Sequence, residues 1–372
     1  MTHFRDLISE YDASAPLERA WTIPASWYRN PQIAAGERAA VFGNSWQFIA
    51  RAEQLAQPGQ YVAAEIAGEP IVAVRDGDGL LRGFFNVCRH HAAAVVTEQC
   101  GTAKLLRCPY HGWTYGLDGS LRGTPDFTGV QDFDPARNGL VHVQLEQWEQ
   151  FVFVHLNPTV HSLRDYFGGF VERVASLDLA RLRFIERRKY ELRCNWKVFV
   201  DNYLDGGYHV PYVHQGLNSV LDYKQYTIET AGRGCLQSSP VESAAATEKD
   251  VGETRRGAAS YFWFYPNFML NWYEGVLDTN LVLPLGIDRT LVIFDFFFGP
   301  EFSDEAARQS VAVSERIQDE DVAICESVQR GIGSCAYRAG RLSVRREGGE
   351  HLFHRLLAQD LKRGFEAGAG EE

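Results

Sequence analysis

Two short strings constrain this chain more than any other feature of its sequence. Cys88-Arg89-His90 is followed about twenty residues later by Cys108-Pro109-Tyr110-His111. Each string places one thiol and one imidazole within a few residues of each other. If both strings serve one metal centre, two loops must approach it from opposite sides. The surrounding chain must then fold into a scaffold that holds two loops side by side.

These donors suit an iron–sulfur cluster better than a single ion. Two Cys thiolates on one iron and two His imidazoles on the other are the ligands of a Rieske [2Fe–2S] centre, which accepts and releases single electrons. A structural zinc ion can use the same donor types, but zinc sites more often begin with two closely spaced cysteines. A third reading, four unconnected core residues, is weaker still. The sequence therefore favours a cluster with these four ligands: Cys88, His90, Cys108 and His111.

The residues around the two strings predict a small β domain. Short apolar runs alternate with turn residues from Trp46 to Leu156, and Asp76-Gly77-Asp78-Gly79 is a strong hairpin signal. The preceding residues instead show amphipathic stretches typical of helices, at Phe4–Tyr11 and Leu17–Trp21. We predict three regions: an N-terminal helical segment (1–42) that packs on the C-terminal domain, an all-β domain (43–157) and the C-terminal domain (158–372).

The C-terminal region mixes helices and strands. Helical stretches are expected at 162–178 and 195–209, and a long helix from about Asp304 to Gly331. The expected strands are 184–193, 224–238, 259–273, 278–285 and 289–299. Strands followed by a long helix predict an α+β domain in which an antiparallel sheet wraps over a helix. Residues 242–258 are small and charged and are expected to form a loop.

A second metal site is predicted from His209 and His214. Five residues apart on one unbroken helix, the two side chains would diverge by about 140°. Pro211 lies between them and interrupts helical hydrogen bonding, so a kink there would let both imidazoles converge. Two His and one carboxylate form a ligand set that suits non-haem Fe(II) and O2. The sequence must therefore also supply a carboxylate.

Periodicity selects that carboxylate among Asp319, Glu320 and Asp321. Asp321 lies on the apolar stripe of the long helix, with Ile317, Ile324 and Val328, whereas Asp319 lies on its charged face. A carboxylate on a buried stripe needs a cation or hydrogen bonds to compensate it. Asp321 is therefore the predicted third ligand; the alternative is a buried structural ion pair.

These residues resemble the Rieske non-haem iron oxygenase α-subunits. The string from Cys108 through His111 to Trp113, and the segment Asn195–His214, carry the resemblance. Respiratory Rieske proteins have an extra Cys in each loop, whereas this chain has Ala93 and Tyr110 there. Further stretches resemble the choline-monooxygenase-like group: Tyr265–Met269, Leu277–Gly286, Glu320–Val322 and Cys325–Gly331.

The resemblance implies more than the motifs themselves indicate. The C-terminal domain should have a helix-grip (Bet v 1-like) fold, and the protein should be a head-to-tail homotrimer. An acidic residue should link a cluster His to an iron His across the subunit interface. The usual position for it, three residues before the first iron His, is Gly206 here, so Asp205 is the candidate and Asp201 the substitute. Asn202 is a further candidate catalytic residue in the same segment.

The sequence lacks a dinucleotide-binding fingerprint, since no G-x-G-x-x-G opens a βα unit. The expected cofactors are therefore the [2Fe–2S] cluster and a mononuclear Fe(II), with O2 as co-substrate. Electrons should come from NAD(P)H through a separate ferredoxin or flavin-dependent reductase.

Aromatic residues indicate where a substrate would bind. Alternate residues of a strand face one side, so Tyr261, Trp263 and Tyr265 are predicted to form a ringed wall, with Trp272 nearby. Aromatic faces attract quaternary ammonium groups, and the subgroup resemblance favours choline or a betaine, hydroxylated or N-demethylated. The alternatives are an ordinary aromatic core, a pocket for apolar aromatic compounds, a Rieske electron carrier and a zinc-stabilised binding module.

Composition restricts the partners. A net charge of −11 argues against general binding to nucleic acid or to an anionic membrane surface. The sequence contains no run of 18 apolar residues and no apolar signal core at its N-terminus, so a cytoplasmic protein is expected. The cysteines outside the cluster strings are expected to be buried thiols: Cys100, Cys194, Cys235, Cys325 and Cys335.

Overall fold

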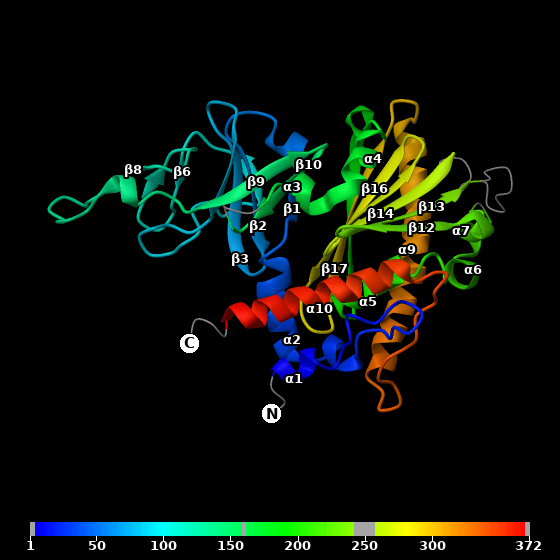
Figure 1. The fold of residues 1–372 in the computed structure, drawn as a ribbon. Helices are drawn as coiled ribbons and strands as arrows, with labels where there is room; N and C mark the ends of the chain where they lie inside the picture. Colours follow the sequence, from blue (N-terminus) through cyan, green and yellow to red (C-terminus); the bar gives the residue numbers. More distant parts are fainter. Residues whose placement is uncertain (1–3, 158–160, 220, 242–256, 369–372) are drawn as a thin grey trace. The chain divides into compact units, whose positions relative to one another are not determined.

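The chain folds into two compact units (Figure 1). The computed structural model describes residues 4–157, 161–219, 221–241 and 257–368. The smaller unit spans Phe42–Tyr166, and the larger unit combines Met1–Val41 with Phe167–Glu372. The N-terminal segment therefore belongs to the larger unit. No helix among the described residues is long and apolar enough to cross a membrane.

The smaller unit is built from antiparallel strands. Its main sheet has the order β1-β10-β9-β4-β3-β2-β5, and a second sheet has the order β6-β7-β8. The strands are β1 (Gln47–Arg51), β2 (Gln60–Ile66), β3 (Glu69–Arg75), β4 (Leu81–Phe85), β5 (Cys100–Thr102), β6 (Leu106–Arg107), β7 (Thr114–Tyr115), β8 (Leu121–Gly123), β9 (His142–Trp148) and β10 (Phe151–His155). The predicted hairpin at Asp76–Gly79 joins β3 to β4, where Asp76 accepts hydrogen bonds from the Asp78 and Leu80 amides.

The larger unit contains a seven-stranded antiparallel sheet in the order β11-β17-β16-β15-β14-β13-β12. Its strands are β11 (Arg183–Leu192), β12 (Thr227–Ala231), β13 (Gly234–Pro240), β14 (Ala258–Phe264), β15 (Phe268–Tyr273), β16 (Val276–Pro284) and β17 (Thr290–Phe298). Its helices include α1 (Phe4–Ile8), α2 (Pro31–Gly36), α4 (Val171–Ala175), α5 (Trp196–Leu204), α6 (Val210–Val213), α7 (Gln215–Asn218), α9 (Asp304–Ile332) and α10 (Gly348–Gly368). The short helix α3 (Leu163–Phe167) crosses the boundary between the units.

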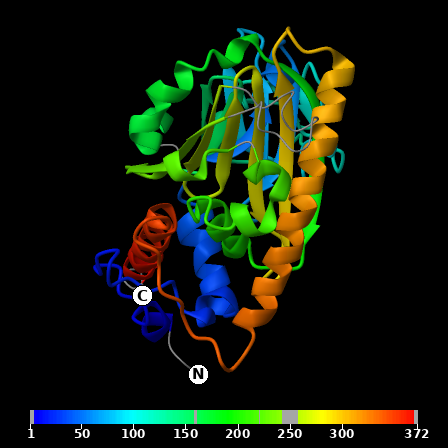
Figure 2. The same cartoon turned by 90° about the vertical axis from the view of Figure 1, so that its right-hand side faces the viewer.

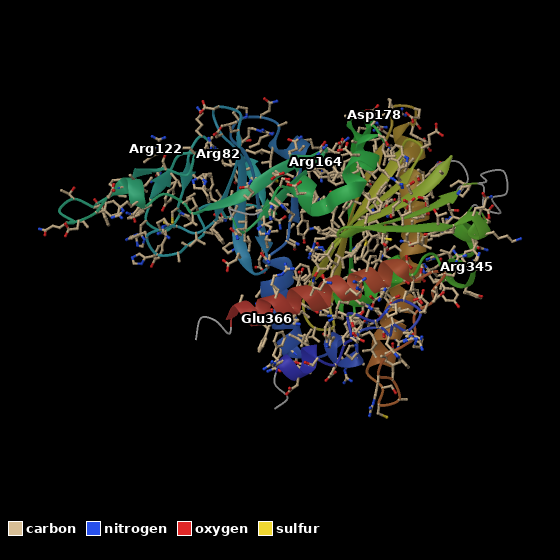
Figure 3. The ribbon with its side chains drawn as sticks, in the orientation of Figure 1. Arg82, Arg122, Arg164, Asp178, Arg345 and Glu366 are labelled. Atoms are coloured by element: carbon tan, nitrogen blue, oxygen red, sulfur yellow. The ribbon has the colours of Figure 1, made fainter. Side chains whose placement is uncertain are left out.

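The long helix α9 runs along the sheet of the larger unit (Figure 2). Ser303 caps its first turn by accepting a hydrogen bond from the Ala306 amide. The sheet with this helix confirms the predicted α+β class. Charged side chains such as Asp178, Arg345 and Glu366 point into solvent (Figure 3).

Strand register places one row of side chains across the middle of this sheet. Gln237 pairs with Tyr261, Tyr261 with Asn271, and Asn271 with Asp278. Directly paired residues of antiparallel strands point to the same face. A polar row therefore crosses four strands of one face, and it ends at Phe296, the partner of Asp278 on β17.

Helix α5 is anchored at its first turn by a buried ion pair. Asn195 caps the helix by accepting a hydrogen bond from the Lys197 amide. The Lys197 ammonium lies 2.6 Å from Glu37, and Glu37 also accepts a hydrogen bond from the Trp196 indole. Breaking a buried pair of this kind typically costs 3–5 kcal/mol. The N-terminal segment thus fixes the start of the helix that leads to the predicted second metal site.

Several sequence expectations need correction. Leu17–Trp21 forms turns and not a helix, because Pro16 and Pro24 leave too few residues for a stable one. Residues 162–178 break into short helical pieces, and the helix expected over 195–209 ends at Leu204. Cys100 and Cys335 are exposed, whereas Cys194, Cys235 and Cys325 are buried as expected. Most of the loop expected at 242–258 lies outside the described residues.

Helix α10 was not among the expected elements. Its apolar side packs into the interior of the larger unit, to which the helix belongs, and Phe353, Leu357 and Leu361 are fully buried there. The Phe353 ring lies 5.5 Å from Trp196 and 5.7 Å from Trp263. Helix α10 therefore covers part of the sheet face that carries the aromatic residues of β14.

Candidate metal centres and substrate cavity

Two tight loops of the smaller unit hold the Cys-His strings. In the first, the Cys88 amide donates a hydrogen bond to the Ala93 carbonyl, and the Ala92 amide donates one to the Cys88 carbonyl. In the second, the Cys108 amide donates to Trp113, and Gly112, with φ of +73°, donates back to Cys108. The left-handed backbone at Gly112 lets the chain turn back directly after His111. Each loop therefore closes on itself around its own thiol and imidazole.

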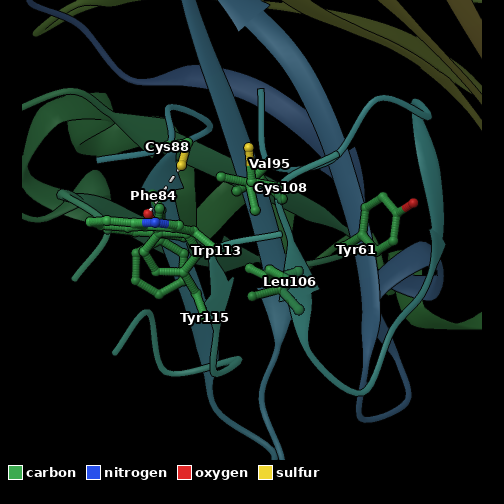
Figure 4. Packing of buried hydrophobic residues seen from close by; sticks show 11 residues of the cluster. Tyr61, Phe84, Cys88, Val95, Leu106, Cys108, Trp113 and Tyr115 are labelled. Carbon is green, nitrogen blue, oxygen red and sulfur yellow. Dashed lines mark hydrogen bonds between the residues drawn. The ribbon is translucent and has the colours of Figure 1, made fainter. Parts of the chain in front are cut away.

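Both cysteines are buried within the core of this unit (Figure 4). The Tyr115 hydroxyl lies 3.3 Å from Cys88 Sγ and also accepts a hydrogen bond of 2.9 Å from the Arg89 amide. Because the hydroxyl oxygen already accepts the amide proton, its own proton can point at the sulfur. Burial raises the pKa of Tyr115, as does its hydrogen bond to Cys88, so the phenol stays a donor.

The histidines of the two loops meet at the edge of this core. The ring centroids of His90 and His111 are 4.8 Å apart, and the His90 ring stacks on Trp113 with an interplanar angle of 3°. Nδ1 of His90 is buried and has no hydrogen-bond partner among the described residues. Burial, together with the nearby His91 and His111, lowers the pKa of His90. A neutral imidazole with an unpartnered nitrogen fits a ligand of a Rieske cluster.

His91 joins this group, although the sequence prediction did not include it. Its ring lies 4.0 Å from His90 and 5.4 Å from His111, and potential ligand atoms of all three lie within 4.8 Å of one another. His91 and His111 are both exposed. Adjacency to His90 was the only sequence signal for His91. The four predicted ligands remain the set with the donor types of a [2Fe–2S] centre.

The second site forms where helix α5 ends. Gly206 and Gly207 both have positive φ, near +68°, and a Cβ on Gly206 would lie 2.1 Å from the Arg346 carbonyl oxygen. A new short helix, α6, then begins, with His209 at its N-cap and Pro211 in its first turn. Helix α5 is therefore followed by a turn at two glycines, and a separate helix with the proline in its first turn comes after it. This corrects the predicted kink at Pro211 within one helix.

His209, His214 and Asp321 converge in the larger unit. Oδ1 of Asp321 lies 3.1 Å from Nε2 of His214 and 3.9 Å from Nε2 of His209. The two imidazole rings are 4.9 Å apart and nearly perpendicular. Three potential ligand atoms within 4.8 Å of one another fit a single metal ion, and two His with one carboxylate match the facial ligand set of non-haem iron.

Each imidazole is held from behind by a second carboxylate. Asp205 lies 2.7 Å from Nδ1 of His209 and also accepts a hydrogen bond from the His209 backbone amide. Glu320 lies 2.7 Å from Nδ1 of His214. Such contacts fix the ring and leave Nε2 for the metal. The Asn202 amide donates to Oδ1 of Asp321 at 2.8 Å, so Asn202 positions a predicted ligand. Sequence reasoning considered Glu320 only as a ligand and missed this role.

Asp201, the substitute for Asp205, faces a different set of residues. It accepts a hydrogen bond of 2.6 Å from the Tyr28 hydroxyl and lies 3.0 Å from Nε2 of His354. Glu350 lies 3.9 Å from the same His354 nitrogen. These contacts link α5 to the N-terminal segment and to α10. Among the described residues, no contact is seen between Asp201 and the imidazole of His209 or His214, whereas Asp205 contacts His209 directly.

A cavity of about 130 Å³ opens beside the three predicted iron ligands. Ring and apolar side chains form part of its wall, and polar residues of the sheet form another part. Its lining residues include Asn202, Tyr203, Tyr226, Gln237, Tyr261, Asn271, Tyr273, Asp278 and Asn280.

Only Tyr261 of the predicted aromatic wall lines this cavity. Trp263 lies on the same face of β14 but is covered by Phe353 of α10, as is Tyr265. Trp272 is out of phase with Asn271 and Tyr273, the cavity-lining residues of β15, and so points to the opposite face. The prediction is corrected at these three positions, because it lacked α10 and the register of β15.

Comparisons with known proteins identify both units of the chain. Residues 45–134 match the Rieske [2Fe-2S] domain, and residues 179–362 match the ring hydroxylating alpha subunit (catalytic domain). The chain is 38% identical to the chloroplastic choline monooxygenase of Arabidopsis thaliana, over 96% of this chain and 86% of that protein. It is 32% identical to the carnitine monooxygenase oxygenase subunit of Escherichia coli (strain K12), over 96% and 98% of the two chains.

Solved structures extend the comparison. A quaternary ammonium Rieske monooxygenase in complex with L-carnitine superposes with a TM-score of 0.81 at 30% identity, over 92% of this chain and 96% of that one. Naphthalene 1,2-dioxygenase from Rhodococcus sp. superposes with a TM-score of 0.78 at 21% identity, over 96% and 97%, which shows a common fold. The chain therefore belongs to the Rieske non-haem iron oxygenase α-subunits, in the choline-monooxygenase-like group.

Proposed function

We propose that this protein is the oxygenase component of a system that oxidises a small quaternary or methylated ammonium compound. It would use O2 and externally supplied electrons to hydroxylate or N-demethylate a compound such as choline, a betaine or carnitine. The observation that carries the proposal is the cavity beside His209, His214 and Asp321, which is lined by tyrosine rings and a carboxylate. The relatives named for choline and carnitine oxidation point the same way.

The cavity wall is suited to a cation. Tyr203, Tyr226, Tyr261 and Tyr273 all line it. A quaternary ammonium group has no N–H to donate, so the negative faces of aromatic rings are its natural contacts, worth ~0.5–2 kcal/mol each. A small apolar aromatic compound, the alternative substrate class, would place an apolar surface against the polar row of Gln237, Asn271 and Asp278.

The residues of the iron site have separable tasks. His209, His214 and Asp321 would hold the iron, which supplies activation of O2 for attack on a C–H bond. Asp205 and Glu320 orient the two imidazoles, and Asn202 orients Asp321. The cavity side chains hold the substrate close to the ligands and exclude water. The net reaction inserts one oxygen atom into a C–H bond, and the second oxygen leaves as water with two protons and two electrons.

Electron supply belongs to the same proposal. The smaller unit would hold the [2Fe–2S] cluster, which takes electrons one at a time from a ferredoxin or flavin-dependent reductase that uses NAD(P)H. We also propose a homotrimer in which Asp205 links His209 to a cluster His of a neighbouring subunit. The contact between Asp205 and His209 supports this link. The structure of one related monooxygenase, 29% identical, has been interpreted in terms of inter-subunit electron transfer.

The test is a panel of quaternary amines and small neutral aromatics, scored by substrate-dependent O2 uptake with a surrogate reductase. We expect uptake with one or more quaternary amines, and product analysis then separates the two outcomes. Hydroxylation of choline gives betaine aldehyde hydrate, whereas N-demethylation releases formaldehyde. Uptake with neutral aromatics and none with any amine would overturn the proposal.

A further inference from the structure

Helix α9 contributes a glutamine to the cavity wall beside the predicted iron ligand Asp321. The residues of this helix that line the cavity are Ser314, Ile317, Gln318 and Asp321. Residues three and four positions apart lie on the same face of a helix, so these side chains form one row. Gln318 precedes Asp321 by three positions in this row. Its amide is therefore placed to contact a molecule that occupies the cavity next to the iron site.

The Gln318 amide has a hydrogen-bonding group that the described residues do not use. The residue is 3% exposed, and its Nε2 is buried with no hydrogen-bond partner among the described residues. A buried donor that lacks an acceptor reduces the stability of the fold, because it loses the hydrogen bonds that water offers in the unfolded chain. Such groups are rare in native proteins and commonly mark a bound water, an ion or a functional contact. An unpartnered amide in the wall of a substrate cavity therefore indicates a contact with a ligand.

Other amides in the same wall already have partners. The Asn202 amide donates to Oδ1 of Asp321 at 2.8 Å. The Gln237 amide donates to the Tyr203 carbonyl at 2.7 Å. These two side chains hold neighbouring groups of the wall in place. Nε2 of Gln318 makes no such contact with the described residues, so it can hydrogen-bond a molecule in the cavity without giving up an existing partner there.

A hydroxyl group of the substrate is the partner that best matches this amide. A glutamine donates through Nε2 and accepts through Oε1, and a hydroxyl can likewise do both. The terminal torsion of a glutamine is broad, so the amide can turn either end toward the hydroxyl. A quaternary ammonium group has no N–H to donate and no lone pair to accept, and its contacts are instead the faces of rings such as Tyr261 and Tyr273. Gln318 would therefore bind a different part of the substrate.

We propose that Gln318 is a specificity-determining residue that hydrogen-bonds a hydroxyl group of the bound substrate. This inference rests on the proposed function and assigns one residue of that site a task. Two attachment points, the rings for the ammonium group and Gln318 for the hydroxyl, fix the orientation of the substrate in the cavity. Because Gln318 and Asp321 belong to the same helix, the hydrogen bond also sets the position of the hydroxyl relative to the iron site. It thereby limits which C–H bond is attacked.

The test compares choline with n-propyltrimethylammonium, in which a methyl group replaces the hydroxyl. Binding of each compound to the anaerobic holoenzyme is measured calorimetrically for the wild type and for Gln318→Met, which keeps an unbranched side chain of similar length. In the variant, choline should bind about three- to tenfold more weakly, as expected for one neutral hydrogen bond. The affinity for n-propyltrimethylammonium should be unchanged or higher. The change in the ratio of the two affinities isolates the contact between the hydroxyl and the amide.

Stability and product analysis provide readouts that a structural role would not give. Without a ligand, Gln318→Met should have a Tm at least equal to that of the wild type, because it removes a buried donor that has no partner among the described residues. With choline, the minor product, whether betaine aldehyde hydrate or formaldehyde, should form a larger share, because the substrate is held at one end only. Gln309→Met, on the exposed side of the same helix, should change neither the affinities nor the product ratio.

The inference fails if Gln318→Met weakens the binding of both compounds equally, if the variant unfolds or loses its mononuclear iron, or if the wild type binds neither compound. Loss of iron would show that the amide supports the predicted ligand Asp321 and not the substrate. The proposed function fails by a different result, in which no quaternary amine supports O2 uptake by the wild type. An unchanged affinity ratio in a protein that oxidises choline would overturn the role of Gln318 alone.

Discussion

The two candidate metal sites hold their histidines in opposite ways. In the smaller unit the Cys88 and Cys108 thiols are buried, while His91 and His111 are exposed and His90 stacks on the ring of Trp113. In the larger unit His209 and His214 each contact a carboxylate and line a cavity.

This difference follows from the two tasks. A centre that relays electrons needs an accessible edge and little control over its surroundings. A centre that activates O2 beside a substrate needs ligands of fixed orientation and a shielded space. The number of carboxylates behind the histidines therefore distinguishes the two sites more clearly than the ligand types do.

The largest effect should separate the two centres completely. His209→Ala removes a predicted iron ligand, so we expect loss of the mononuclear iron, about a third of the total iron, and of substrate turnover. The visible absorption of the cluster should stay unchanged, because its ligands lie in the other unit. Iron analysis and absorption spectra of the same preparation provide the check. Loss of both signals together would contradict the assignment of separate sites.

A smaller effect should distinguish the two carboxylates that contact the predicted iron ligands His209 and His214. Asp205 is largely buried and contacts His209 twice, whereas Glu320 is 46% exposed and contacts His214 once. Removing an outer partner of a metal ligand typically costs about 10–100-fold in metal affinity or activity. We expect Asp205→Asn to fall in this range and Glu320→Gln to cost less, because water can replace an exposed contact.

Iron titration and kcat/KM measured for both variants give that order. A larger loss in Glu320→Gln than in Asp205→Asn would reverse it. The same pair tests the link to a neighbouring subunit, since single-turnover oxidation of the cluster should slow in Asp205→Asn beyond any loss of iron. An unchanged rate would place the link elsewhere.

Sequence reasoning succeeded where the relevant spacing is local. The convergence of His209, His214 and Asp321 agrees with the prediction from short-range spacing. Val328 of the predicted apolar stripe is nevertheless exposed. The reason given for that convergence was wrong, because the turn at Gly206 and Gly207 does what was attributed to Pro211. A pair of adjacent glycines was the signal that could have shown it.

The cavity wall was less predictable because it depends on contacts between distant segments. Tyr261 and Trp263 have the same parity on β14, but α10 covers one and leaves the other at the cavity. Helix α10 itself had a readable signal, since Phe353, Leu357 and Leu361 repeat at four-residue intervals. The roles of Asn271 and Asp278 depend on strand register, and a single sequence does not fix register between strands.

The two units should also differ in their response to pH. Burial, followed by the negative charges of Asp201, Glu347 and Asp205, raises the pKa of Glu350 on α10 well above 4.5. His354 faces the same carboxyl from 3.9 Å. Because the folded state holds this proton more tightly than the unfolded state, the stabilisation is complete below about pH 4.5. It is lost as pH rises through the raised pKa.

Glu350→Gln keeps the shape and removes the titration, so its stability relative to wild type should increase as pH rises. Between about pH 5 and pH 8 we expect the difference in Tm of the larger unit to grow by a few degrees, since ~1 kcal/mol corresponds to ~2–4 °C in a domain of this size. Bleaching of the cluster on heating reports the smaller unit, and should show the same pH dependence in both proteins. Parallel Tm curves for the larger unit would contradict the role of Glu350.

The smallest effect should fall on the potential of the cluster alone. The Tyr115 hydroxyl accepts a hydrogen bond from the Arg89 backbone amide, and its own proton can point at Cys88 Sγ. A hydrogen bond to a ligand sulfur stabilises the reduced cluster, which carries the extra negative charge. Tyr115→Phe should therefore lower the midpoint potential by a few tens of millivolts, because ~1 kcal/mol corresponds to about 40 mV for one electron.

Tyr110→Phe is the matched control for this substitution. Tyr110 lies in the second loop with its ring against His111, but its side chain is largely exposed. Redox titration followed by visible absorption should show a shift in Tyr115→Phe and none in Tyr110→Phe, with the mononuclear iron retained in both. Equal potentials in the three proteins would mean that the Tyr115 proton points away from the sulfur. Burial of the Cys88 thiol, and not a hydrogen bond from Tyr115, would then be the factor that sets the contribution of this loop to the cluster potential.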